Sequence, residues 1–353
     1  MVKISNMIDL NNIEEIKRLD PQDTLGSTEK LGEQMAAAWE QVQHVEVPDD
    51  YKNVSNIVFC GMGASIYGAL VFKALTGENN KYPTEYVSDY HLPKFVNNNS
   101  LVVLTSYSGT TEEVLSCAHE AKEMGAKMLI LTKGGPLSEF ARENNIPSYI
   151  FDGALNPAGV PRLGNGYTIL GLLGLLNKAG IYHIDEAEVK DAIALLGEKK
   201  AEIKQWAQGD AQKYMGKVPI VIAAEHLSGN AQILRNQFNE TSKAFSAFYL
   251  VPDLNHHLME GLQFPHPTNL QFILLVSGNY SEKIQKRMKL TSDVIKQNNH
   301  VVHDVTSNGS SKFADFLTTL AYGCYLTLYL GLLYEQNPAV NPWVDWFKNE
   351  LAS

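Results

Sequence analysis

The period of the hydrophobic pattern changes repeatedly along this chain. Short continuous apolar runs that end in glycine- or hydroxyl-rich turns predict buried strands, whereas apolar residues at every third or fourth position predict helices. In the first half the predicted strands and helices are 56–60, 66–75, 101–104, 112–124, 128–131 and 148–151. Because strands alternate with helices, the pattern indicates a parallel sheet with right-handed crossovers.

A second run of the same kind fills the rest of the chain. Its predicted strands and helices are 218–224, 228–242, 245–251, 271–277, 281–297 and 300–305, followed by helices at 313–334 and 343–351. The similar order of elements favours duplication of one α/β unit. A polar helix at 186–206 lies between the two runs, and we place the boundary between 180 and 215.

Residues 1–50 precede the first predicted strand and carry apolar residues at three-to-four spacing in a polar background. We expect helices here that pack on the outside of a domain. The predicted organisation is a helical segment at 1–50, a first α/β domain at 51–200 and a second at 210–353 that includes the C-terminal helices.

Charge removes two classes of partner from consideration. Of the 353 residues, 29 are Lys or Arg and 39 are Asp or Glu, which gives a formal charge of −10. An acidic chain without a dense basic block is a poor candidate for binding nucleic acid or an anionic membrane surface. We therefore expect no nucleic-acid partner and no membrane partner.

Cysteine use and the apolar runs indicate a soluble cytoplasmic protein. Cys60, Cys117 and Cys324 cannot all pair and have no CxxC spacing, which argues against a disulfide framework and a structural zinc site. The N-terminus carries acids and amides where a signal peptide has an apolar core. The longest apolar stretch, 320–334, is shorter than the roughly 18–20 residues of a membrane span, so it predicts a buried helix.

A glycine turn in the first half predicts part of an anion site. Gly61 and Gly63 allow backbone N–H groups to approach a ligand closely, and Ser65 lies in the first turn of the helix that follows. Taken alone, Ser65 is as well explained by helix capping. The turn matches no nucleotide motif, because it lacks the Gly-Lys-Ser/Thr end of a P-loop and has Ile66 where a Rossmann fingerprint has its third glycine.

A second turn is rich in hydroxyl groups. Ser106, Ser108, Thr110 and Thr111 surround Gly109 directly before a predicted helix, whose N-terminus is the positive end of its dipole. A helix cap needs one hydroxyl, so this cluster favours phosphate binding without any Lys or Arg.

The second half holds candidate groups for catalysis. Residues 235–243 read Arg-Asn-Gln-Phe-Asn-Glu-Thr-Ser-Lys and place Asn236, Gln237 and Glu240 on one side of a helix, which faces either solvent or a site. Glu240 and His256 together supply the carboxylate base and the neutral-pH acid that proton transfer in a sugar requires. A structural role for His256 is the alternative. His256 and His257 do not predict a metal site, because adjacent side chains diverge and no HxxxH or HxH spacing lies nearby.

Both turns of the first half resemble one fold family. Ser-Tyr-Ser-Gly-Thr-Thr-Glu at 106–112 resembles the S-x-S-G-x-T phosphosugar-binding turn of the sugar isomerase (SIS) fold. Residues 61–65 resemble the earlier glycine-serine turn of that fold.

Segments of the second half resemble one particular enzyme family with this fold. Residues 235–243 resemble the R-x-K/N-Q-x-N-E-x-x-K segment of the bifunctional phosphoglucose/phosphomannose isomerase family. Residues 254–256 resemble the L-x-H-N segment that follows it in that family. Arg162 matches the arginine of that family, and 344–348 match its lysine-bearing C-terminal helix. The motifs occur in the family's order from about residue 55 to the end of the chain.

The resemblance implies a fold and a substrate. The expected fold is two SIS-type doubly wound parallel-sheet domains, flavodoxin-like α/β/α sandwiches, with flanking helices. The small-molecule partner is a sugar phosphate, held by Gly63, Ser65, Ser106, Ser108 and Thr111. The expected reaction interconverts glucose 6-phosphate and/or mannose 6-phosphate with fructose 6-phosphate through a cis-enediol.

The resemblance also implies a catalytic set. Glu240 moves a proton between C2 and C1, His256 assists ring opening with help from Lys348, and Arg162 stabilises the enediolate. Because Arg and Lys meet the enediolate charge, we expect no metal and no cofactor. We expect a homodimer with the active site at the subunit interface, where His256 reaches the partner's Glu240.

The sequence departs from the family pattern at two positions, since Thr110 and His257 stand where the family usually has Asn. Another phosphosugar isomerase or deglycase, or a non-catalytic sugar-phosphate binder, is the alternative. A sensor attached to a DNA-binding module is disfavoured because the chain has no basic helix-turn-helix segment.

Overall fold

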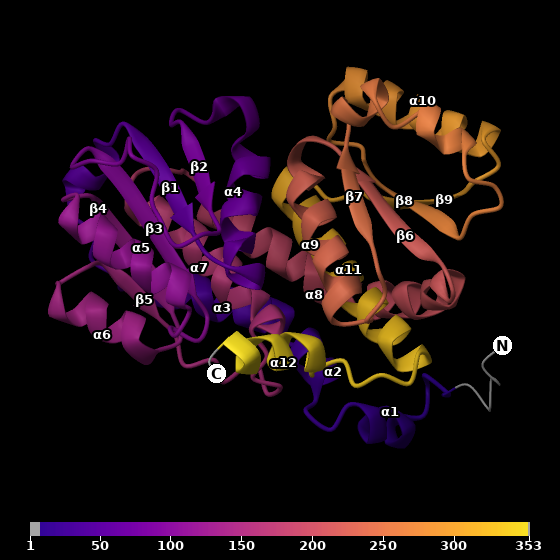
Figure 1. Ribbon diagram of the computed structural model, residues 1–353, viewed down its shortest axis with the longest axis horizontal. Helices are drawn as coiled ribbons and strands as arrows, with labels where there is room; N and C mark the ends of the chain where they lie inside the picture. The colour runs from indigo at the N-terminus through magenta and orange to yellow at the C-terminus, as the bar shows by residue number, and fades with distance from the viewer. Residues whose placement is uncertain (1–7, 352–353) are drawn as a thin grey trace.

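The computed structural model describes residues 8–351 and contains two parallel sheets (Figure 1). The first has the order β2-β1-β3-β4-β5, with β1 Asn56–Cys60, β2 Thr84–Val87, β3 Ser100–Ser106, β4 Lys127–Thr132 and β5 Ser148–Ile150. The second has the order β7-β6-β8-β9, with β6 Val218–Ala223, β7 Ala247–Leu250, β8 Leu270–Ser277 and β9 Val301–Ser307. The first order is that of flavodoxin, and the second repeats it without a fifth strand. The predicted fold class is confirmed.

Helices flank both sheets, and further helices lie outside these layers. The helices of the described residues are α1 Ile13–Leu19, α2 Thr24–Glu29, α3 Leu31–Val42, α4 Tyr67–Thr76, α5 Glu112–Glu123, α6 Gly135–Glu143, α7 Asn165–Lys178, α8 Glu186–Ala211, α9 Ser228–Glu240, α10 Glu282–Gln297, α11 Lys312–Leu333 and α12 Pro342–Leu351. The strand β2 and the helix α6 occur where the sequence analysis placed no element. Positions 1–7 of the expected helical segment and 352–353 of the expected second domain lie outside the described residues.

Side chains of the first sheet alternate between two cores. Ile57 and Phe59 pack on the face covered by α4 and α7, whereas Val58 and Cys60 pack on the face covered by α5 and α6. Both faces are therefore buried, which explains why these strands read as continuous apolar runs. The N-terminal helix α3 is less peripheral than expected, because Met35 packs fully buried in the core against which α7 lies.

The helix α11 is the core helix of the second half. Its 22 residues are long and apolar enough to cross a membrane, but 94% of its apolar 18-residue window is buried inside the protein. It packs against α8 and α9. It begins eight residues before the apolar run 320–334, so the helix is longer than that run indicates. The predicted buried helix is confirmed, and its burial accounts for its hydropathy.

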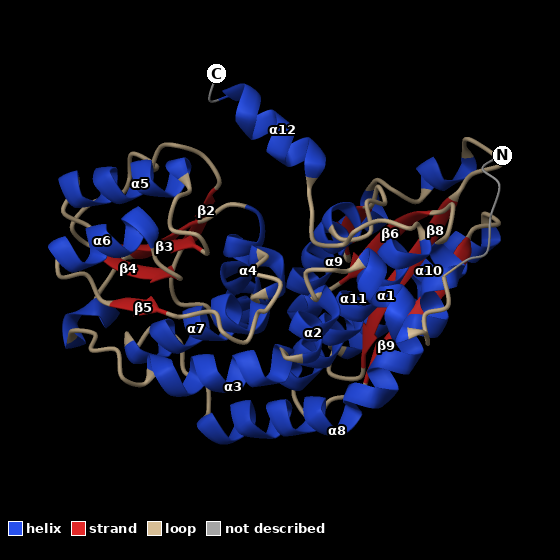
Figure 2. Cartoon of the chain, turned by 90° about the horizontal axis from the view of Figure 1, so that it is seen from below, coloured by secondary structure: helices blue, strands red, loops and turns tan. Residues whose placement is uncertain are grey.

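The helix α12 stands apart from the rest of the chain (Figure 2). None of its residues is buried, although Trp343, Trp346, Phe347 and Leu351 are large and apolar, and the exposed fraction of Trp343 is 81%. The spacing of these residues places them along one side of the helix. The described residues therefore leave an apolar helix face without cover.

Candidate active site

The two predicted phosphate turns meet at the carboxyl edge of the first sheet. Cys60 of β1 lies opposite Leu104 of β3, so the turns that follow the two strands lie where the strand order reverses. Flavodoxin-like sheets bind ligands at this switch point. Gly63 has a φ of +55°, which favours glycine, and Ser65 Oγ accepts a hydrogen bond from the Tyr107 N–H at 3.1 Å, which joins one turn to the other.

The hydroxyl groups of the second turn are bonded to one another. Ser106 Oγ and Thr111 Oγ1 are 2.7 Å apart, Ser108 Oγ and Thr110 Oγ1 are 2.9 Å apart, and the Gly109 N–H donates to Ser106 Oγ at 3.0 Å. Thr111 is at the N-cap of α5, where no side chain of the described residues caps the helix. The N–H groups at the start of α5 can therefore receive an anion with these hydroxyls around it.

The N-terminus of α10 is already bonded to a carboxylate, unlike that of α5. α10 follows β8 as α5 follows β3, but its start is bound by a carboxylate of the chain itself. Ser281 donates to Glu225 twice, from its N–H at 3.0 Å and from its Oγ at 2.5 Å. An incoming anion would meet the charge of Glu225 there.

A second carboxylate, that of Asp315, lies at the carboxyl edge of the second sheet. Asp315 is fully buried, and it accepts hydrogen bonds from Ser277 Oγ at 2.5 Å and from the Gly309 N–H at 2.6 Å. Burial raises the pKa of Asp315, but hydrogen bonds from His226, Ser277 and Asn279 outweigh it and hold this pKa below its usual value. Glu225 and Asp315 thus occupy, at the carboxyl edge of the second sheet, the place that an anion would take. At the corresponding edge of the first sheet the two turns leave that place open.

Glu240 ends α9 beside a buried arginine from the first half of the chain. Arg162, in the 3-10 turn before α7, has Nη1 3.8 Å from Glu240 Oε2, and the exposed fractions of the two side chains are 4% and 32%. Its Nη2 donates to the carbonyls of Pro338 and Ala339, and its Nε donates to Thr241 Oγ1 at 3.2 Å. Burial lowers the pKa of Arg162, and the Glu240 charge opposes this. Arg162 thus links α9 to the segment that leads into α12.

Lys243 is a second cation close to Glu240, and the sequence analysis assigned it no role. Its Nζ donates to the backbone carbonyl of Glu240 at 2.7 Å. Burial, followed by repulsion from Arg162, lowers the pKa of Lys243 to about 8. Two cations beside one carboxylate make this region suitable for a negatively charged intermediate.

The polar side of α9 is partly withdrawn from solvent. Gln237 is 3% exposed and donates to Cys324 Sγ of α11 at 3.0 Å, while Asn236 and Glu240 are half-buried. Beside Glu240 lies an open hollow of about 440 Å³, lined also by Arg235 and Tyr249. Of this polar side, Gln237 is withdrawn from solvent, whereas Asn239 is exposed and Asn236 and Glu240 border the open hollow. Burying an amide is costly unless it serves structure or a site.

The structure does not bring two of the sequence-predicted residues to Glu240. His256 is exposed in the 3-10 turn Asp253–His256 after β7, and Lys348 is exposed in α12. Within residues 8–351 neither forms a hydrogen bond or ion pair with Glu240 or Arg162. In one copy of the chain, therefore, the site contains Glu240 and Arg162 without His256 and Lys348.

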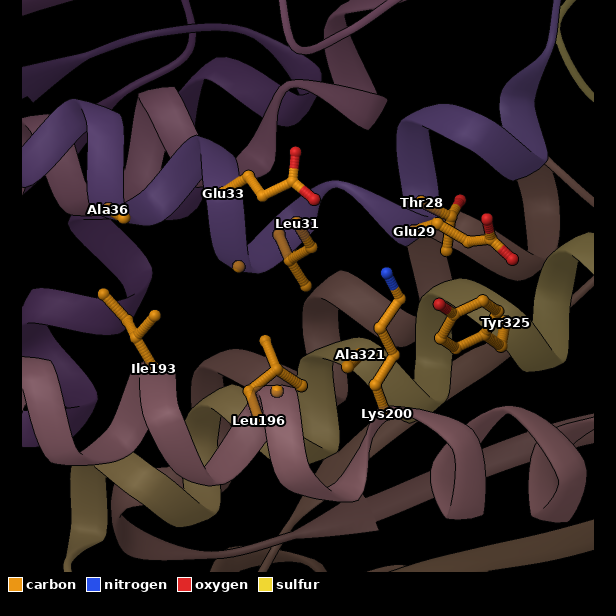
Figure 3. Close-up of a pocket in the computed structure, with 12 residues that line it drawn as sticks. Thr28, Glu29, Leu31, Glu33, Ala36, Ile193, Leu196, Lys200, Ala321 and Tyr325 are labelled. Carbon is orange, nitrogen blue, oxygen red and sulfur yellow. The ribbon is translucent and has the colours of Figure 1, made fainter.

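A more enclosed hollow lies away from these residues (Figure 3). It measures about 240 Å³ and lies between α3, α8 and α11, with Leu31, Ile193 and Leu196 among its apolar lining. None of the sequence-predicted site residues lines it. Among residues 8–351, no group of three or more His, Cys, Asp or Glu side chains is arranged to hold a metal ion.

Family models match both halves of the chain. The SIS domain matches residues 50–150, and the bacterial phospho-glucose isomerase C-terminal SIS domain matches residues 203–351. The bifunctional phosphoglucose/phosphomannose isomerase of Caldicellulosiruptor bescii is 31% identical over 340 residues, which cover 92% of this chain and 98% of that protein. The enzyme of the same name from Aquifex aeolicus is 31% identical, over 89% of this chain and 95% of its own length.

Solved structures show the same fold at low identity. A hypothetical protein of Thermus thermophilus superposes with a TM-score of 0.73 at 16% identity, over 96% of this chain and 93% of that one. The tagatose-6-phosphate ketose/aldose isomerase of Escherichia coli has a TM-score of 0.67 at 16% identity, over 93% of this chain and 95% of that one.

Proposed function

Because the chain belongs to the bifunctional phosphoglucose/phosphomannose isomerase family, we propose that it interconverts glucose 6-phosphate and mannose 6-phosphate with fructose 6-phosphate through a cis-enediol. The observation that carries this proposal is the Glu240 carboxylate held 3.8 Å from buried Arg162, with half-buried Lys243 bonded to the Glu240 backbone carbonyl. A base among fixed positive charges is what formation of an enediolate requires.

The phosphate of the substrate binds at the switch point of the first sheet. Ser65, Ser106, Ser108 and Thr111 supply hydroxyl donors, and the turn at Gly63 and the start of α5 supply backbone N–H groups. The sugar carbons then extend toward the end of α9.

Glu240 takes the proton from C2 of the aldose and returns it to C1, with the reverse order from fructose 6-phosphate. Arg162 stabilises the enediolate through its charge, because its Nη2 and Nε are bonded to the chain and its Nη1 lies between the Asn341 side-chain amide, at 3.0 Å, and the Glu240 carboxylate, at 3.8 Å. We assign Lys243 to the same electrostatic role, which needs neither a metal nor a cofactor.

A second copy of the chain completes the site. The partner's His256 approaches Glu240 to assist ring opening, and Lys348 supports it from α12. The exposed apolar side of α12 supports this homodimer, because an isolated ten-residue helix is marginal in water and gains stability by burying such a face. Arg162 holds the base of α12 next to the active site through Pro338 and Ala339.

The chain divides into three units. We propose that the units are a helical segment at 1–50, a first domain at 51–200 and a second at 210–353, and that the enzyme is cytoplasmic. The SIS and C-terminal SIS matches at 50–150 and 203–351 support this division.

The first experiment is a coupled assay of the purified protein with fructose 6-phosphate, in which glucose 6-phosphate and mannose 6-phosphate are measured separately. We expect both products. Turnover to one epimer contradicts the dual specificity. No turnover, with fructose 6-phosphate still raising the melting temperature, identifies a binder or an enzyme for another phosphosugar.

Thr111→Val and Ser106→Ala should each raise the KM for fructose 6-phosphate about tenfold and leave kcat within about twofold. Each removes a hydrogen bond to a charged phosphate, which is worth roughly 1.5–3 kcal/mol when fully formed. Inhibition by inorganic phosphate should weaken in parallel, which separates loss of the phosphate contact from damage to the sugar site. An unchanged KM and an unchanged phosphate inhibition constant in Thr111→Val, the more isosteric change, would place the phosphate elsewhere.

A further inference from the structure

The helix that leaves the glycine turn begins with a buried tyrosine. Tyr67 is the first residue of α4, two positions after Ser65, and its exposed fraction is 0%. α4 packs against α9, the helix that ends in Glu240. Tyr67 therefore lies between the phosphate turn of one half of the chain and the proposed base of the other.

The hydroxyl of Tyr67 has no hydrogen bond of good geometry within the described part of the chain, although the Asn236 amide lies near enough to interact with its oxygen. A buried hydroxyl without a partner has lost its hydrogen bonds to water and gained none in the protein, so it lowers the stability of the fold. A phenylalanine would fill nearly the same space without this cost. An orphaned polar group in a native core requires an explanation, and its surroundings supply one.

The groups around this hydroxyl belong to the active site. They are the Glu240 carboxylate, the Asn236 amide, the Arg162 guanidinium and the Cys324 thiol. Burial, and then the charge of Glu240, raise the pKa of Tyr67, so the phenol keeps its proton and is a hydrogen-bond donor at neutral pH. The acceptor of highest charge among its neighbours is the Glu240 carboxylate.

We propose that Tyr67 is a positioning residue for Glu240, whose hydroxyl donates a hydrogen bond to the Glu240 carboxylate when α4 and α9 close on a bound sugar phosphate. This inference rests on the proposed isomerase function. Catalytic hydrogen bonds are often long in free enzymes and tighten in the substrate complex. The phenol then orients the carboxylate toward C1 and C2 and favours its ionised form.

Tyr67→Phe should lower kcat for fructose 6-phosphate about tenfold, equivalent to about 1.4 kcal/mol, and change KM by less than about twofold. The acid limb of the kcat–pH profile should move up by about half a unit to one unit, because loss of a donor raises the pKa at which the base becomes protonated. Arg162, Lys243 and the Cys324 thiol also surround the pair, but the substitution changes none of them. The melting temperature should stay the same or rise.

Tyr325→Phe is the matched control. Tyr325 is 2% exposed in α11, its hydroxyl also lacks a partner among residues 8–351, and it lines the hollow between α3 and α8 rather than the active site (Figure 3). Removal of this hydroxyl should affect the melting temperature as Tyr67→Phe does, with no change in kcat or in the acid limb.

Three results overturn the inference. A kcat and an acid limb in Tyr67→Phe equal to those of the unchanged protein show that the hydroxyl does not act on Glu240. A raised KM with unchanged kcat shows that it contacts the substrate instead. In both cases the unchanged protein still turns over fructose 6-phosphate and the proposed function stands, whereas absence of turnover by the unchanged protein removes both proposals.

Discussion

Glu240→Gln should reduce isomerisation of fructose 6-phosphate by about 10⁴-fold while leaving sugar-phosphate binding nearly intact. The amide has almost the shape of the carboxylate but cannot accept the proton from carbon. The proposed phosphate contacts lie on the other sheet and are unchanged. Arg162 keeps its bonds to Thr241, Pro338 and Ala339, so the fold should persist despite the lost ion pair.

Two measurements separate the chemistry from binding in this variant. Exchange of the C2 and C1 hydrogens with deuterium from solvent reports proton transfer directly, and the thermal shift induced by fructose 6-phosphate reports binding. Glu260→Gln, at an exposed carboxylate of the same half of the chain, is the control and should retain full kcat. Retained exchange in Glu240→Gln would remove the base assignment, and a lost thermal shift would mean that Glu240 holds the sugar.

Mixing two inactive variants should restore activity if the partner's His256 completes the site of Glu240. His256→Ala and Glu240→Gln homodimers should each be nearly inactive. A mixed dimer has one site that carries both substitutions and one that carries neither. With random exchange of subunits, half of the dimers are mixed, so about a quarter of the unchanged activity should return.

The experiment requires subunit exchange, which unfolding and joint refolding of the two variants provides. The unchanged protein treated in the same way sets the recoverable activity, and size-exclusion chromatography establishes that dimers re-form. If dimers form and the mixture stays inactive, His256 acts in its own chain. Full activity of the His256→Ala homodimer by itself would show that His256 has no catalytic role. If the unchanged protein is a monomer, the shared site is wrong.

Local chemistry made most of the elements predictable. The run at 101–104 lies within β3, which is buried on both faces, so no alternation with polar residues obscures it. In β2, Thr84–Val87, only Val87 is buried, and a four-residue edge strand leaves little periodic signal. α12 was predicted as a helix, but nothing in its local pattern shows that its apolar side is left uncovered by the rest of residues 8–351.

What the sequence alone determined about this protein is the alternation of strands and helices, the duplicated α/β plan and the two turns that we propose bind phosphate. These follow from neighbouring residues, because periodicity, turn chemistry and helix N-termini act over a few positions. Only the tertiary structure brought Arg162 to Glu240, left the Tyr67 hydroxyl without a well-placed partner among residues 8–351, and put the Glu225 and Asp315 carboxylates at the carboxyl edge of the second sheet. These contacts join residues far apart in the chain. They depend on which side chains are withdrawn from water when the two halves of the chain pack together. The residues next to each of these side chains in the sequence do not indicate this.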